Sequence, residues 1–274
     1  MVYIGVREDQ SALIFDGPFL GDFAPEALTS SSIADVTSHW EWPILANKRE
    51  EFPAIRQNAH IALDRVEAYH NGGRRLLDYG CGGGVFLNVA KERQWEVYGL
   101  EPLVGHAIHA RGFAGATVIA DTLRSDTFPP GYFDAVTAFQ VFEHLPDPRA
   151  EMSKLASFTR AGGTLLIEVP NIDTPMVRLL GPRHRHFVQD HLNFFSAHTL
   201  RMLMKQHGFD PLETYYPRRV MTWRHLVSGW GGVVYGDWWR RRAANVLRRL
   251  GIADRTVSVG VGDIVAVIAR KRQP

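Results

Sequence analysis

The residues most suited to chemistry begin in the stretch LLDYGCGGGVF, residues 76–86, which holds four glycines in the five positions from Gly80 to Gly84. Glycine lacks a Cβ atom and adopts positive φ angles, so it suits a loop whose main chain approaches a ligand closely. Asp78 stands two residues before the first glycine, which gives the pattern Asp78-x-Gly80-x-Gly82-x-Gly84. We therefore expect a ligand to bind against this loop.

A second acid, Glu101, follows Asp78 by 23 residues and ends the next apolar run. In α/β proteins a glycine loop that opens a helix receives the polar end of a nucleoside ligand, and a carboxylate after the second strand accepts hydrogen bonds from the ribose hydroxyls. The dinucleotide pattern Gly-x-Gly-x-x-Gly does not fit, because its third glycine would fall on Val85 or Leu87. An acid at Asp78 would repel a pyrophosphate and suit a cationic group, such as the amino group of a methionine moiety.

Short apolar runs alternate with helix-sized segments along the chain, and these elements must position the polar residues. The runs are nearly continuous in hydrophobicity, as expected of strands covered on both faces. They are residues 75–79, 95–100, 116–120, 133–139 and 164–169. Helices are expected at 86–94, at 103–112 and at 148–163, the last closed by Gly162 and Gly163, after a lead-in helix at 56–73. The alternation predicts an α/β fold with a parallel sheet.

The composition limits the class of protein. With 274 residues, of which 45% are hydrophobic, the chain can bury a full core. A single cysteine, Cys81, excludes an internal disulfide framework and a cysteine-based zinc site, and it favours a reducing compartment. No apolar run approaches the roughly 18 residues that a spanning helix needs. We expect a cytoplasmic protein.

Three downstream stretches carry a resemblance to a known family. They are GYFDAVTAFQVFEHLPDP, AGGTLLIEVPN and DHLNFFSAHTLRMLMKQHGF. Together with the glycine loop they resemble the class I S-adenosylmethionine-dependent methyltransferases, in the branch of ubiquinone-type O-methyltransferases and of sugar and polysaccharide-cluster methyltransferases. The resemblance covers about residues 60–216 and 262–272. It implies a Rossmann-like fold, with a seven-stranded, mostly parallel sheet and a C-terminal antiparallel strand, for which GDIVAVIARK is the candidate.

The resemblance also implies a cofactor, S-adenosyl-L-methionine, and its binding residues. Asp78, Gly80, Gly82 and Gly84 match the loop that holds the methionine part, and Glu101 matches the acid that binds the ribose. Two further positions are implied. Asp121 matches the acid on the adenine side, although Asp126 in the same loop competes for this role, and Gln140 falls where the main chain meets the methionine amino group.

Two histidines are candidates for a general base. His144, in the stretch FEHL, is expected at the mouth of the site, and His191 matches the histidine that heads the related stretch of this branch. An imidazole can accept a proton near neutral pH. Alternatively, Glu143 and His144 brace the following turn, or they form part of a divalent-metal site. His184 and His186 are a further possibility for metal binding, but imidazoles at i and i+2 converge only on a strand or loop. We therefore assign no metal ligand.

The chain divides into an N-terminal cap (1–58), a methyltransferase core (59–217), an insert (218–261) and a final core strand with the tail (262–274). From Pro217 to the end there are twelve Lys or Arg residues against three acids. The insert adds four tryptophans, at positions 223, 230, 238 and 239. This composition is typical of an interfacial segment. It predicts peripheral contact with an anionic membrane surface through residues 223–249, whereas no motif of an RNA-binding module supports nucleic acid as a partner.

The predicted function is methyl transfer from S-adenosylmethionine to a small-molecule or lipid-linked acceptor, with a hydroxyl group as the expected methylated group. Two alternatives stay open at this point. The enzyme could methylate carbon or nitrogen of a nucleotide-linked sugar, or the chain could be a nucleoside-binding protein without turnover. The intact glycine loop and the FEHL stretch favour an enzyme.

Overall fold

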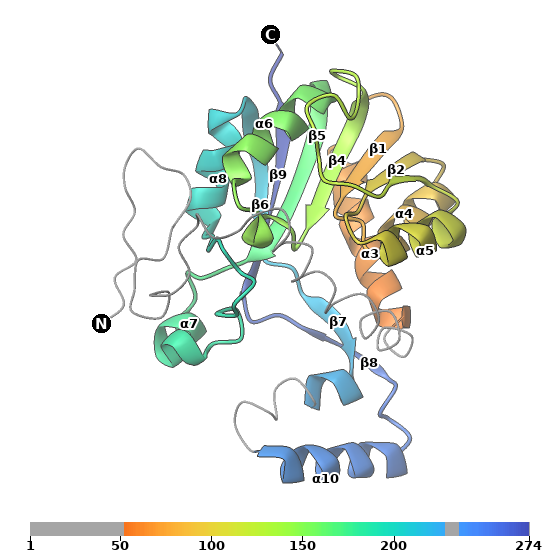
Figure 1. Ribbon diagram of the computed structural model, residues 1–274. Helices are drawn as coiled ribbons and strands as arrows, with labels where there is room; N and C mark the ends of the chain where they lie inside the picture. Colours follow the sequence, from red (N-terminus) through yellow and green to blue (C-terminus); the bar gives the residue numbers. More distant parts are fainter. Residues whose placement is uncertain (1–51, 228–235, 274) are drawn as a thin grey trace.

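The computed structural model describes residues 52–227 and 236–273, and within these ranges the side chains of residues 182, 236–241 and 244 are not described. Seven strands of the described ranges form one sheet in the order β3-β2-β1-β4-β5-β9-β6 (Figure 1). Their bounds are β1 (Arg75–Tyr79), β2 (Glu96–Leu100), β3 (Thr117–Ile119), β4 (Phe133–Phe139), β5 (Thr159–Pro170), β6 (Phe209–Tyr215) and β9 (Ile264–Lys271). Only β9 pairs antiparallel with its two neighbours in this sheet, β5 and β6. The predicted Rossmann-like fold class, with an antiparallel C-terminal strand, is confirmed.

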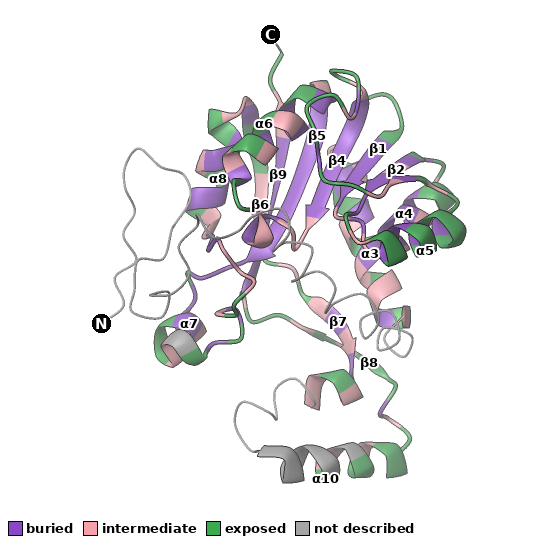
Figure 2. Ribbon diagram, in the orientation of Figure 1, coloured by how far each residue is buried: buried purple, intermediate pink, exposed green. Residues whose placement is uncertain are grey.

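Helices cover both faces of the sheet. Consecutive residues of a strand point to opposite faces, so Leu76 packs into one core cluster and Leu77 into the other. The cluster around Leu76 includes residues of α3 (Phe52–Ala68), α4 (Val85–Glu92) and α5 (Val104–Ala114). The cluster around Leu77 includes residues of α6 (Pro148–Phe158) and α8 (Ala197–Gln206). The central strands are therefore buried on both sides (Figure 2), as their continuous hydrophobicity predicts.

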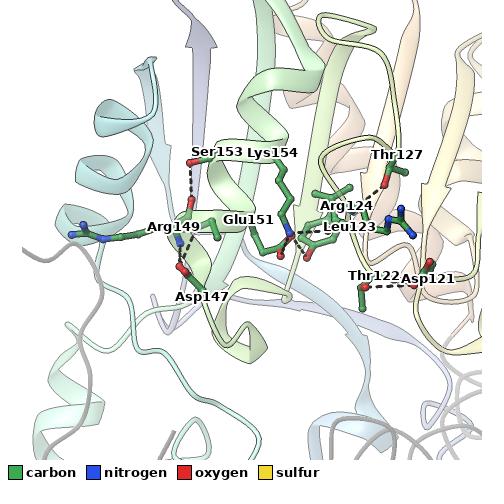
Figure 3. Close-up of polar contacts among 12 residues, drawn as sticks. Asp121, Thr122, Leu123, Arg124, Thr127, Asp147, Arg149, Glu151, Ser153 and Lys154 are labelled. Carbon is green, nitrogen blue, oxygen red and sulfur yellow. Dashed lines mark hydrogen bonds and ion pairs between the residues drawn. The ribbon is translucent and has the colours of Figure 1, made fainter. Parts of the chain in front are cut away.

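Side-chain caps fix where α6 and α8 begin. The carboxylate of Asp147 accepts hydrogen bonds from the main-chain N–H groups of Arg149 and Ala150, both at 3.0 Å, and Pro148 occupies the first helical position (Figure 3). Ser196 and Thr199 form a reciprocal capping box at the start of α8. These caps satisfy N–H groups that a helix start leaves without an intrahelical acceptor.

Several predicted boundaries differ from the structure. The lead-in helix, for example, spans Phe52–Ala68 and not residues 56–73. The end of the helix after Pro148 is the case in which the structure shows the cause. The sequence suggests that the helix after Pro148 ends at Gly162 and Gly163, but α6 ends at Phe158 and β5 begins at Thr159. Thr159 pairs with Phe133 of β4, and the register shifts between Phe133 and Ala135. Gly163 is needed inside the strand, because a Cβ atom there would lie 2.9 Å from the carbonyl oxygen of Arg160. The glycine pair therefore serves an irregular strand start and not a helix end.

The insert forms a small unit beside the carboxyl ends of the parallel strands. Its strands β7 (Arg219–Thr222) and β8 (Thr256–Val259) pair antiparallel as a separate two-stranded sheet. In Figure 1 this sheet lies below the main sheet, with α10 (Gly236–Arg249) beneath it. The side-chain amide of Asn58 in α3 joins the unit to the core, accepting from the N–H of Val220 at 2.9 Å and donating to its carbonyl at 2.8 Å.

Parts of the predicted division lie beyond what is described. Residues 1–51 of the predicted N-terminal cap fall outside the described residues, and the boundary after residue 58 falls within α3. Trp230 of the insert is also outside the described residues. Across residues 52–227 and 236–273, no helix combines the length and apolar character needed to cross a bilayer.

Candidate active site

The glycine loop leaves β1, crosses the end of β2 and leads into α4. The N–H groups of Gly80 and Cys81 donate to the carbonyl oxygen of Leu100, at 2.8 and 3.2 Å. Gly84 then adopts φ 81° as the residue before the first helical residue of α4. The loop is thus held against the last residue of β2, at the carboxyl edge of the sheet, where ligands of open α/β sheets bind.

The glycines of this loop serve two purposes. A Cβ atom on Gly80 would lie 2.4 Å from Cγ2 of Val141, and one on Gly84 would lie 2.9 Å from Cα of Ala110, so close packing requires both. Gly82 also has a positive φ, 52°, but a Cβ atom there would meet no described atom within 4 Å. The main chain at Gly82 is therefore open to a ligand.

Glu101 is fixed beside this open position. Its carboxylate, with the residue 6% exposed, accepts hydrogen bonds from the N–H of Gly82 at 2.8 Å and from the N–H of Leu103 at 3.0 Å. A carboxylate offers about four lone-pair sites, so two remain for further donors such as ribose hydroxyls. The structure thus brings together Gly82 and Glu101, which the sequence pattern pairs.

Asp78 lies deeper, inside β1. It is 2% exposed and accepts a hydrogen bond from the hydroxyl of Thr137 in β4 at 2.8 Å. Burial raises the pKa of its carboxyl to about 7, against the opposing effect of the Thr137 hydrogen bond. A cationic group bound nearby would favour the ionised form.

Asp121 and Asp126, the two acids considered for the adenine side, differ in their contacts, and Figure 3 shows the contact of Asp121 with Thr122. Asp121 is exposed just after β3, and its carboxylate accepts from the N–H of Thr122 at 2.7 Å. Asp126 instead pairs with Arg124 at 3.1 Å, with both side chains exposed. Lys154 of α6 donates to the carbonyl oxygen of Leu123 at 2.7 Å and so ties this loop to the core. The role of Asp121 stays a prediction.

Gln140 follows β4 in an unusual backbone conformation. Its φ is 55°, and its N–H donates to the carbonyl oxygen of Glu168 in β5 at 2.9 Å. The side-chain amide donates to the Glu168 carboxylate at 3.2 Å, and Arg219 of β7 forms an ion pair with the same carboxylate. Burial raises the pKa of Glu168, although Arg219 opposes this shift. The sequence analysis missed the Glu168–Arg219 pair, because 51 residues separate its members.

His144 and His191 lie side by side. Their ring centroids are 4.8 Å apart. Nδ1 of His144 contacts the carbonyl oxygen of Asp190 at 2.8 Å, and Nδ1 of His191 contacts the carbonyl oxygen of His186 at 2.8 Å. A carbonyl only accepts, so both Nδ1 atoms carry protons and the lone pair of each neutral ring is on Nε2. Burial, with a further effect of His144, lowers the pKa of His191 to about 4.

This histidine pair lies next to the glycine loop. His144 ends the short helix η2 (Phe142–His144), and Val141, the residue before this helix, is the side chain that approaches Gly80. The carbonyl oxygen of Glu143 accepts from the N–H groups of Leu192 at 2.7 Å and Asn193 at 2.9 Å, which holds the His191 segment against η2. The structure therefore brings both predicted bases to the carboxyl edge.

The burial of the Glu143 carboxylate could not be predicted from the sequence. Glu143 is 1% exposed, and neither carboxylate oxygen has a hydrogen-bond partner among the described residues. Burial raises the pKa of its carboxyl to about 8. Glu143, His144 and His191 offer ligand atoms that lie within 4.8 Å of one another, so these groups could also hold a divalent cation. The divalent-metal alternative stays open.

Comparisons with known proteins agree with this geometry. The methyltransferase domain family matches residues 49–214. A ubiquinone biosynthesis O-methyltransferase of Aeromonas salmonicida is 29% identical over 158 residues, which cover 53% of this chain and 66% of that protein. A protein of the same description from Aliivibrio fischeri is 27% identical over 190 residues, which cover 63% of this chain and 78% of that protein. The chain thus spans just under two thirds of the first of these relatives.

A solved structure shows the same fold. A SAM-dependent methyltransferase from Archaeoglobus fulgidus superposes with a TM-score of 0.53 at 22% identity, covering 79% of this chain and 94% of that one. Because the family match includes the glycine loop, Glu101, His144 and His191, it spans the candidate site as well as the sheet. The chain belongs to the methyltransferase domain family, and its fold is that of the SAM-dependent methyltransferase from Archaeoglobus fulgidus.

Proposed function

We propose that this chain transfers a methyl group from S-adenosylmethionine to a hydroxyl group of a small-molecule acceptor. The observation that carries the hydroxyl assignment is the pair His144 and His191, with ring centroids 4.8 Å apart beside the glycine loop. Hydroxyl acceptors lose a proton on methylation, and a neutral imidazole can accept it. The relatives named ubiquinone biosynthesis O-methyltransferase support the same choice.

The residues of the carboxyl edge fit the cofactor. The open main chain at Gly82 suits the approach of the methionine part, and the carboxylate of Glu101, held by two N–H groups, suits the ribose hydroxyls. The buried carboxyl of Asp78 suits a cationic amino group. We assign the cofactor to these three residues with Gly80, Gly84, Asp121 and Gln140.

In the proposed mechanism, most of the work of the protein is positioning. S-adenosylmethionine supplies an activated sulfonium methyl group. The chain must hold the acceptor oxygen in line with that group, and such placement can contribute about 7–11 kcal/mol. Nε2 of His144 takes the hydroxyl proton, while the carbonyl of Asp190 accepts a hydrogen bond from Nδ1 and stabilises the resulting imidazolium. A phenol, with a pKa near 10, needs less help from the base than a sugar hydroxyl.

Labelled-methyl transfer tests the proposal. Protein and S-adenosylmethionine with a labelled methyl group are incubated with catechols, monophenols, nucleotide-linked sugars, and lipid and glycan fractions, and the products are identified by mass spectrometry. We expect label on a phenolic oxygen. Label on carbon or nitrogen of a sugar would replace the proposal with the alternative acceptor. Binding of S-adenosylhomocysteine without transfer to any fraction, including lipids and glycans, would favour a non-catalytic protein.

Variants then separate the two histidines. His144→Ala should lower turnover by about 10²- to 10⁴-fold with unchanged S-adenosylhomocysteine affinity, and His191→Ala is measured in parallel. His198→Ala, an exposed change on α8, is the matched control. Turnover equal to the control in both variants would leave positioning as the whole mechanism. Loss of activity with a chelator, restored by Mg²⁺, would instead favour the metal alternative at Glu143, His144 and His191.

The exposed arginines of the insert support a lipid-linked acceptor. Arg248 and Arg249 at the end of α10 are exposed, whereas the side chains of Trp238, Trp239, Arg240 and Arg241 lie outside the described residues. Exposed arginines near an anionic surface can each add about 1 kcal/mol. Sedimentation with phosphatidylserine vesicles should exceed that with phosphatidylcholine vesicles and fall with salt. Arg240→Ser, Arg241→Ser and Arg242→Ser together should reduce it, and no sedimentation of the native protein would contradict peripheral binding.

A further inference from the structure

A second histidine cluster lies beside the His144–His191 pair, and the proposed function does not use it. His184, His186 and Asp263 are 5%, 6% and 7% exposed. The rings of His184 and His186 have centroids 4.8 Å apart, and Nε2 of His186 lies 3.5 Å from Oδ2 of Asp263. Each residue offers one ligand atom, and the three atoms lie within 4.8 Å of one another. Two imidazoles and a carboxylate thus meet in a buried place.

We propose that His184, His186 and Asp263 bind a divalent transition-metal ion of the zinc type. Imidazole nitrogens and a carboxylate oxygen are the ligands that zinc takes in proteins, at about 2.0–2.2 Å. Nε2 of His186 lies 3.5 Å from Oδ2 of Asp263, which is long for a hydrogen bond.

The buried Nε2 of His186, which lies 3.5 Å from Asp263, is a further indication of a ligand. Nε2 of His186 has no hydrogen-bond partner among the described residues. A buried polar atom without a partner destabilises a fold by about 1–3 kcal/mol, and bonding to a metal ion would remove that penalty. Nδ1 of His184 has only a long contact, 3.4 Å, with the N–H of His186, and metal binding would exchange this contact for a metal–nitrogen bond.

Main-chain hydrogen bonds fix both segments that supply the ligands. His184 follows the short helix η3 (Gly181–Arg183), and its N–H donates to the carbonyl oxygen of Gly181 at 3.0 Å. The carbonyl oxygen of Asp263 accepts from the N–H of Asn171 at 2.9 Å, at the end of β5. The two histidines converge because this segment is a turn, as imidazoles at i and i+2 require.

The contacts of Arg185 suggest an alternative, in which Asp263 belongs only to a structural ion pair. The Nε and Nη2 atoms of Arg185 donate to Oδ2 of Asp263, at 2.9 and 2.7 Å. A purely structural ion pair would need no metal ion. However, both of these bonds end on Oδ2, so the second oxygen of the carboxylate, Oδ1, is the atom that would bind the ion. Arg185 can therefore orient Asp263 while the carboxylate also serves an ion.

Ion binding would also affect the orientation of His191 in the His144–His191 pair. The carbonyl oxygen of His186 accepts the hydrogen bond from Nδ1 of His191 at 2.8 Å. An ion on the His186 ring would hold this residue in place and, through its carbonyl, the orientation of His191. His186 would then be a positioning residue for His191, although the metal proposal does not depend on that role.

Zinc titration of untagged protein tests the proposal. The protein is stripped with a chelator and titrated with Zn²⁺ against a chromophoric competitor. We expect the unmodified protein to bind one equivalent of Zn²⁺ tightly. The affinity should be at least about 100-fold weaker in His186→Ala and in His184→Gln, because loss of a ligand should exceed the 10- to 100-fold effect of losing a supporting residue. Glu143→Gln, in the neighbouring cluster, should leave it unchanged. Mg²⁺ should not compete, since it prefers oxygen ligands.

A measurement on the unmodified chain covers the case in which variants fail to fold. Anomalous diffraction at the zinc edge from soaked crystals locates the ion directly. An anomalous peak between His184, His186 and Asp263 supports the proposal. A peak only at Glu143, His144 and His191, or at neither cluster, overturns it, as does a titration in which Glu143→Gln removes the site and His186→Ala does not.

Discussion

The two halves of the carboxyl edge satisfy their polar groups in different ways. At the ends of β1 and β2, the Asp78 carboxyl accepts from Thr137, and Glu101 accepts from two main-chain N–H groups. On the other side, between η2 and β9, both carboxylate oxygens of Glu143 and Nε2 of His186 are buried without hydrogen-bond partners among the described residues. The cofactor half is complete within the chain, and the histidine half is not.

This difference separates a preformed region from one that gains by binding. The great majority of buried side-chain polar atoms in folded proteins have partners, and leaving one without a partner costs about 1–3 kcal/mol. Such a penalty persists at functional sites, where binding can remove it. We therefore expect substitutions in the cofactor half to weaken binding and stability, and substitutions in the histidine half to change function and pH dependence.

The largest effect is expected at Glu101. If Glu101 binds the ribose as proposed, Glu101→Ala removes two hydrogen bonds to the ribose hydroxyls as well as the hydrogen bonds from the N–H groups of Gly82 and Leu103. At about 1.5–3 kcal/mol for each bond to a charged group, the affinity for S-adenosylhomocysteine should fall by roughly 10²- to 10⁴-fold in calorimetry. Glu96→Gln, an exposed change at the start of the same strand, is the control and should bind normally. An unchanged dissociation constant in Glu101→Ala would move the ribose acid elsewhere.

The next effect concerns the ion pair that joins the insert to the sheet. Arg219→Ala leaves the buried Glu168 carboxylate without its charged partner. Breaking a buried pair in this way typically destabilises a protein by about 3–5 kcal/mol, which urea unfolding at pH 7.5 should detect. Arg178→Ala removes an exposed pair with Asp173 and should cost under about 1 kcal/mol. Equal effects would show that Glu168 does not depend on the insert.

Glu143 should give the histidine half its pH dependence. Burial raises the pKa of its carboxyl to about 8 in the folded state, above the ordinary value near 4.5, so the folded state binds more protons between these two pH values. Stability should therefore fall as pH rises from about 5 to 8, by on the order of 1 kcal/mol per pH unit. Below pH 4.5 both states hold the proton and the effect vanishes.

The measurement compares Glu143→Gln with the unmodified chain by urea unfolding at pH 5, 6.5 and 8. Subtracting the two curves removes the contribution of other groups, including Asp78. The variant should gain stability relative to the unmodified chain as pH rises. Glu92→Gln, an exposed change on α4, should follow the unmodified chain. Parallel curves for Glu143→Gln would mean that the carboxylate is ionised and has a partner.

The sequence predicts the cofactor half well because its signals are local. β1 and β4 match the predicted runs residue for residue, and β2 differs by one residue at its start. The glycine spacing and Glu101 fall on adjacent strand ends for the same reason, since consecutive βα units place these ends together. The predicted end of α6 was wrong, because a glycine pair after a helical pattern resembles a helix end. The pairing of Thr159 with Phe133 cannot be predicted from the residues around Thr159.

The histidine half depends on contacts between distant segments. Asp263 meets Arg185 across 78 residues, and Asp190 meets His144 across 46. The sequence singles out His184, His186 and His191 by residue type, but it gives no reason to join Asp263 to them. Burial of Glu143 is equally hidden, because a charged residue in a turn is normally exposed.

The smallest effect tests how the insert is held at its other contact. The amide of Asn58 makes two hydrogen bonds with the main chain of Val220, as a neighbouring strand would. Asn58→Ala leaves the N–H and the carbonyl of the buried Val220 without this partner, so urea unfolding should show a loss of about 1–2 kcal/mol. Asn245→Ala, which removes an exposed contact with Arg248, should change stability by less than about 0.5 kcal/mol.

If the insert is a rigid part of the site, Asn58→Ala should also raise the KM for the acceptor while leaving S-adenosylhomocysteine affinity unchanged, because Glu101 and Gly82 lie on the other half of the edge. A loss of cofactor affinity in Asn58→Ala would show that the two halves of the carboxyl edge are coupled and do not act as separate regions.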